Sequence, residues 1–103
     1  MDVDQVSMEI IANAGAGKSK VYRALEVGID GDLAQARELI SSAQEDVNRS
    51  HEVWHQVLTA FAEGEAPEPN LLIMHAMDIM IAAETELELA RHVLRLAERR
   101  AAV

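Results

Sequence analysis

The sequence predicts an all-α fold, an antiparallel three-helix bundle that runs up, down and up again. Hydrophobic residues make up 50% of the 103 residues but aromatic ones only 3%, so the core must consist of Ala, Leu, Ile, Val and Met, a mixture that favours helices. Apolar residues recur at steps of three and four, and no alternating strand pattern competes. Breaks at residues 28–32 and 64–70 make consecutive helices antiparallel neighbours. We expect one domain over residues 1–103, with helices at about 4–28, 32–63 and 70–100.

The first two predicted helices each carry one apolar face. In the first helix this face contains Val6, Ile10, Ala14, Gly17, Val21, Ala24 and Gly28. The second helix begins where Asp32 can cap the free amides of the first turn, with Gln35 in the capping-box position. Its apolar stripe contains Leu33, Ala36, Ile40, Ala43, Val47, His51, Trp54, Leu58 and Phe61.

The third predicted helix starts with a segment that is apolar on every side. From Leu71 to Ala83 the only polar residues are His75 and Asp78. Two companion helices cannot cover such a helix all round, so we expect further subunits. At about 100° per residue, the stripe predicted to face the core contains Leu72, Ala76, Ile79, Ala83, Ala90, Leu94 and Ala97. The opposite stripe contains Leu71, Met74, Asp78, Ile81 and Thr85, and His75 lies at its rim, about 60° from Asp78.

Composition and charge exclude several classes of protein. A chain without cysteine has no disulfide framework and no thiolate zinc site. The acidic N-terminus and the lack of an apolar run of about 18 residues argue against secretion and membrane insertion, so we expect a cytoplasmic location. A net charge of −9 argues against nucleic-acid binding.

Residues 12–19, Ala-Asn-Ala-Gly-Ala-Gly-Lys-Ser, fit the looser form of the phosphate-loop pattern. A phosphate loop follows a buried strand, whereas these residues lie within a continuous amphipathic helix. We interpret them as a face of small residues that permits close helix packing.

Residues 51–55, His-Glu-Val-Trp-His, match the H-E-x-x-H pattern of zinc proteases. His51 lies in the apolar stripe and His55 about 40° from it, and no third ligand is evident. We favour a packed His51 beside a partly exposed His55 over a zinc site.

His75 and Asp78 are the residues best suited to take part in chemistry. An ionised Asp78 among Met, Ile and Leu costs several kcal/mol unless it is paired, and no Lys or Arg occurs between Arg49 and Arg91. Copies of Asp78 from several subunits could converge and share a metal ion or protons, or a single Asp78 could be solvated at a gap in the surface. The imidazole of His75 could act as a nucleophile, although a lone histidine in an apolar segment is more often a satisfied core residue.

Three segments of the chain resemble enzyme IIA of the lactose/cellobiose class of the bacterial sugar phosphotransferase system. Residues 10–19 and Ala24-Leu25 resemble I-I-x-x-A-G-x-A-x-S and A-L, and residues 31–36 resemble G-D-F-x-x-A. Residues 72–78, Leu-Ile-Met-His-Ala-Met-Asp, resemble L-x-x-H-A-Q-D, and His51 falls in the family's A-H-x-x-Q run.

This resemblance implies a homotrimeric phosphocarrier. His75 would be the catalytic residue, phosphorylated by the histidine-containing phosphocarrier protein, and would pass the phosphoryl group to a cysteine of enzyme IIB. Asp78 would bind a divalent metal ion, for which we expect magnesium, at the trimer axis. The transported sugar would be a disaccharide such as lactose, cellobiose or chitobiose.

The chain departs from the family pattern beside the predicted nucleophile. The family's H-A-Q-D-H-L-M becomes His-Ala-Met-Asp-Ile-Met-Ile at residues 75–81, and Trp54 stands where the family has glutamine. An amide and a second histidine are therefore missing. Retention of His75 and Asp78 favours an active carrier; the alternative is a non-catalytic, trimeric regulatory or assembly module.

Overall fold

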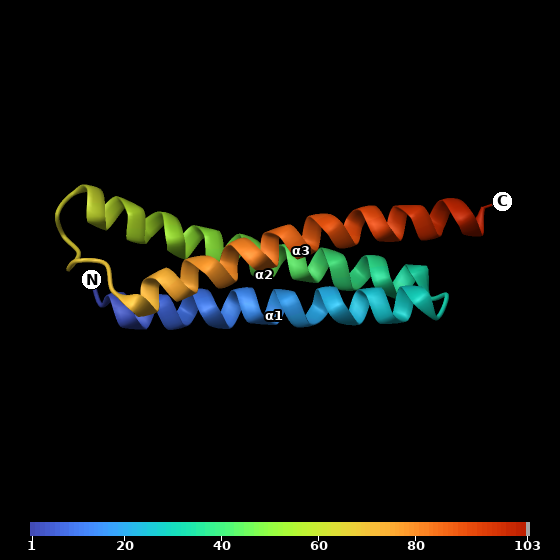
Figure 1. The fold of residues 1–103 in the computed structure, drawn as a ribbon, viewed down its shortest axis with the longest axis horizontal. Helices are drawn as coiled ribbons and strands as arrows, with labels where there is room; N and C mark the ends of the chain where they lie inside the picture. Colours follow the sequence, from blue (N-terminus) through green and yellow to red (C-terminus); the bar gives the residue numbers. More distant parts are fainter. Residues whose placement is uncertain (103) are drawn as a thin grey trace.

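The computed structural model describes residues 1–102, and these form three long helices with no strand (Figure 1). The helices are α1 (Val3–Ile29), α2 (Leu33–Ala62) and α3 (Leu71–Ala101). The predicted all-α, three-helix fold is confirmed. Each observed helix end lies one residue from the predicted one. The bundle is a rod of 56 × 18 × 18 Å in which α1 and α3 run in the same direction and α2 runs in the opposite direction.

Local hydrogen bonds account for the start of each helix. A side-chain oxygen accepts a hydrogen bond from a first-turn amide at Asp2 (from Gln5, 3.1 Å), Asp32 (from Gln35, 3.0 Å) and Asn70 (from Ile73, 3.0 Å). The predicted cap at Asp32 is therefore confirmed. Gly31, just beyond the end of α1, has a φ of 97°, a conformation that side-chain-bearing residues rarely adopt. This turn directs the chain back along α1.

The core is formed mainly by small and medium side chains on one face of each helix. On α1 it includes Ile10, Ala14, Val21 and Ala24, as the sequence predicts. A Cβ atom at Gly17 would lie 3.3 Å from the carbonyl oxygen of Ala43 and 3.2 Å from Val47. Glycine at this position thus allows α1 and α2 to approach closely.

The predicted core faces of α2 and α3 are wrong in part. In the second half of α2 the buried apolar residues are Val53, Val57 and Ala60, whereas Leu58 is exposed and His51, Trp54 and Phe61 are half-buried. In α3 the core contains Ile73, Met80 and Leu87, and the predicted Leu72, Ile79 and Ala97 are only half-buried. Both faces are rotated because these helices carry more apolar residues than the interior can hold, and the residues closest to α1 are buried first.

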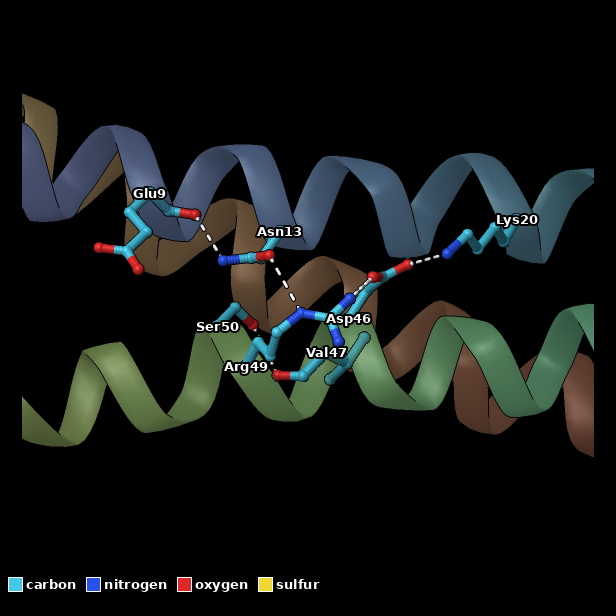
Figure 2. A network of polar contacts seen from close by, with 7 residues as sticks. All are labelled: Glu9, Asn13, Lys20, Asp46, Val47, Arg49 and Ser50. Carbon is cyan, nitrogen blue, oxygen red and sulfur yellow. Dashed lines mark hydrogen bonds and ion pairs between the residues drawn. The ribbon is translucent and has the colours of Figure 1, made fainter.

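A buried carboxylate joins α1 to α2 (Figure 2). The Asp46 side chain is only 4% exposed, and it forms ion pairs with Lys20 of α1, at 2.7 Å, and with Arg49, one turn further along α2. The Arg49 Nε donates a hydrogen bond of 3.4 Å to the side-chain oxygen of Asn13. Two cations thus compensate the cost of burying this charge.

Among the described residues, no helix combines the length and the hydropathy that a membrane span requires.

We predict that removing both cations harms the protein more than removing the buried charge. Lys20→Met combined with Arg49→Met leaves the Asp46 carboxylate buried without a counter-charge, so the free energy of unfolding should fall by about 3 kcal/mol. Asp46→Asn should cost less, because the freed Lys20 and Arg49 side chains are 35% and 51% exposed and can turn to water. Chemical denaturation followed by circular dichroism, at one protein concentration, measures both. A larger loss for Asp46→Asn would contradict this account.

Candidate functional site

His75 and Asp78 lie near the N-terminal end of α3, and both side chains are exposed in the single chain. Neither takes part in a side-chain hydrogen bond or ion pair within residues 1–102. The reading of His75 as a satisfied core residue is therefore wrong for the single chain. An exposed imidazole without an internal partner is free to meet a reacting group on another protein.

The face of α3 that carries Asp78 is apolar and uncovered. Leu71 is 83% exposed, Met74 54% and Ile81 49%, and Thr85 is exposed as well. The predicted opposite stripe therefore does point away from α1 and α2. Apolar area of this kind on one side of a long helix is typical of a surface that packs against another chain.

Two of the departures from the family pattern meet at a pocket between α2 and α3. Trp54 and Met77 both line an apolar pocket of about 330 Å³, together with Leu58, Phe61, Pro69, Ile73 and Met74. Residues two apart on a helix point about 200° from one another. Met77 therefore lies on the side of α3 opposite His75, and the missing amide is not beside the imidazole of the same chain.

The third departure lies on the same side of α3 as His75. Ile79 follows His75 by one turn, is half-buried and packs against the core. A hydrophobic contact thus replaces the histidine that the family pattern has at this position.

His51 belongs to a contact between α2 and α3. Its Nε2 atom pairs with the carboxylate of Glu84, and its ring centroid lies 6.2 Å from that of His55. No group of three or more His, Cys, Asp or Glu side chains that could hold a metal ion occurs in the described part of the chain. The H-E-x-x-H pattern therefore has no third ligand within residues 1–102.

The segment that resembles a phosphate loop lies inside α1, as expected. Residues 12–19 are helical throughout, and Lys18 forms an ion pair of 2.7 Å with Glu86 of α3. Gly17 faces α2 at close range. The structure thus supports the interpretation that these small residues serve packing.

Comparison with known proteins identifies the family to which this three-helix chain belongs. The profile of the family described as "PTS system, Lactose/Cellobiose specific IIA subunit" matches residues 5–98. The chain is 29% identical to the lichenan-specific phosphotransferase enzyme IIA component of Bacillus subtilis, over 95% of this chain and 89% of that protein. It is 34% identical to the galactose-specific EIIA component of Lactococcus lactis, over 86% of this chain and 77% of that protein.

A solved structure shows the same architecture. The crystal structure of the cellobiose-specific enzyme IIA from Bacillus anthracis superposes with a TM-score of 0.92 at 29% identity, covering 99% of this chain and 94% of the other. Proteins of this class are phosphotransferase-system components that carry phosphoryl groups. The chain belongs to the lactose/cellobiose-specific IIA family of the phosphotransferase system.

Proposed function

We propose that this chain carries its phosphoryl group on His75 in the uptake of a disaccharide of the lactose, cellobiose or chitobiose type. The observation that supports this most directly is the exposure of His75, without an internal partner, within a family of phosphocarriers. The donor is the histidine-containing phosphocarrier protein, and the acceptor is a cysteine of enzyme IIB. Both partners and the reaction are cytoplasmic.

The reaction needs little from this chain besides an accessible imidazole and a docking surface. A ring nitrogen of His75 attacks the phosphorus of the donor's phosphohistidine in line, so that a new P–N bond forms as the donor's P–N bond breaks. The cysteine thiolate of enzyme IIB then attacks the same phosphorus, which forms a P–S bond and releases the neutral imidazole. No sugar pocket is needed on this subunit.

The functional unit that we propose is a homotrimer formed by the exposed face of α3. Three parallel copies of this face cover Leu71, Met74 and Ile81 and bring three Asp78 carboxylates to the axis. Carboxylate oxygens are hard ligands that suit magnesium, so three copies of Asp78 fit a divalent cation that one copy cannot hold. Such a cation would offset two of the three carboxylate charges, one turn from the phosphoryl group on His75.

The proposed role of His75 is tested by phosphorylation. Incubation with the general phosphotransferase proteins and phosphoenolpyruvate should place an acid-labile label on His75, and His75→Gln should remove it, because glutamine has no nucleophilic ring nitrogen. His55→Gln is the matched control and should keep the label. An unlabelled wild-type protein, with a known IIA component labelled alongside, would favour a non-catalytic module instead.

The proposed assembly is tested by its mass and by replacement of Asp78. Light scattering should give about three times the monomer mass. Asp78→Leu removes three charges from an apolar interface, so the metal-free trimer should be as stable as the wild type or more stable by about 1–4 kcal/mol. Thr85→Leu, one heptad further along the same stripe, is the matched control. It adds apolar area without removing a charge, so its effect on trimer stability can be subtracted from that of Asp78→Leu. Marked dissociation of Asp78→Leu would show that the carboxylate is required for assembly.

A further inference from the structure

The exposed apolar face of α3 continues far beyond Asp78. Leu89 is 63% exposed and Leu96 64%, and the exposed His92 lies between them. These three residues are spaced by three and four, which is the spacing of the contact line in a coiled coil. In addition, His92 follows Asp78 and Thr85 at intervals of seven. A parallel coiled-coil contact between α3 helices that brings the Asp78 side chains together therefore also brings the His92 side chains together.

The helices α1 and α2 cover only one side of this end of α3, where Leu94 is buried and Glu98 pairs with Arg37 of α2. The last turns of α3 extend beyond the turn that joins α1 to α2 (Figure 1). Leu89 and Leu96 lie on the side of α3 that these helices leave open, and such exposed leucines are best covered by the same helix in another copy. The apolar contact in the assembly thus continues to the C-terminal half of α3.

The imidazole of His92 is oriented by its own helix. Its Nδ1 atom lies 2.8 Å from the carbonyl oxygen of Glu88. Because a carbonyl oxygen can only accept a hydrogen bond, Nδ1 carries the proton, and in the neutral ring the lone pair is on Nε2. Metal-binding histidines are commonly held in this way, with one nitrogen bonded to a carbonyl oxygen and the other presented to the metal.

We propose that three copies of His92 bind a zinc-type divalent ion on the axis of the trimer, through their Nε2 atoms. This inference rests on the proposed homotrimer. Three neutral imidazoles suit zinc and similar transition metals and leave one position of a tetrahedron for water. The Glu88 carboxylates, one turn away, supply negative charge near the ion. At 1.5 Å per residue the site is about 21 Å from the Asp78 carboxylates, and its softer donors select a different metal.

Zinc titration of the intact trimer tests this site. With excess magnesium present to occupy oxygen ligands, calorimetry should show saturable binding of one zinc ion per three chains. Cobalt should give the visible absorption of a tetrahedral site. His92→Gln should lose both signals while light scattering still gives a trimer, and His92→Asn is a second variant in case the first fails to assemble.

Matched variants distinguish this site from the H-E-x-x-H pattern of α2. His51→Gln and His55→Gln should retain the binding of one ion per three chains. Binding of one ion per chain that survives His92→Gln and is lost in His55→Gln would overturn the inference, as would a trimer without saturable zinc binding.

The same samples separate this inference from the proposed function. A trimer that labels His75 but binds no zinc contradicts only the zinc site. A trimer that binds zinc at His92 but takes no label supports the zinc site and contradicts the phosphocarrier role of His75. A monomer contradicts the assembly and, with it, the zinc site.

Discussion

The uncovered face of α3 is the constraint on which the rest of the molecule depends. Full burial of one large apolar side chain contributes about 1.5–3 kcal/mol, and Leu71, Met74, Ile81, Leu89 and Leu96 are all exposed in the single chain. These side chains are already partly buried, with 49–83% of their area exposed, so covering all five is worth about 5–9 kcal/mol for each subunit before the cost of association. Burying one unpaired carboxylate costs several kcal/mol. The apolar gain therefore exceeds the cost of carrying Asp78 into an interface, particularly if the carboxylates share a cation.

Asp46 and Asp78 show two ways of placing a carboxylate among apolar residues. Asp46 is buried within one chain, where Lys20 and Arg49 reach it. Asp78 has no Lys or Arg near it in sequence, and its side chain is exposed. The first charge holds α1 against α2, whereas the second can be compensated only by something outside the chain. This contrast explains why Asp78, rather than Asp46, is the candidate for a shared metal.

The number of helices and their ends could be predicted because both depend on local signals. Caps such as Asp32, the glycine after α1 and the apolar period all act within a few residues. Which side of α2 is buried depends instead on which residues occupy the interior. Val53 and Val57 do so, and the larger Trp54 and Leu58 do not. Close packing against α1 admits the smaller side chains. The distance between α1 and α2 cannot be obtained from the sequence pattern alone. The ion pair of Asp46 with Lys20 could not be predicted for the same reason, because Lys20 lies on another helix, whereas Arg49 lies one turn from Asp46 on α2.

The position of the substituted residues bears on how far this chain has diverged from its family. Trp54 and Met77 line one pocket, so two changes from amide to apolar side chains occur together and leave no unpaired polar group behind. Met77 points away from His75, so this pair alters the packing of α2 against α3 rather than the surroundings of the imidazole. Only Ile79 lies on the same side of α3 as His75, and it packs into the core. Within one chain, the face of α3 around His75 is therefore less altered than the substituted motif suggests.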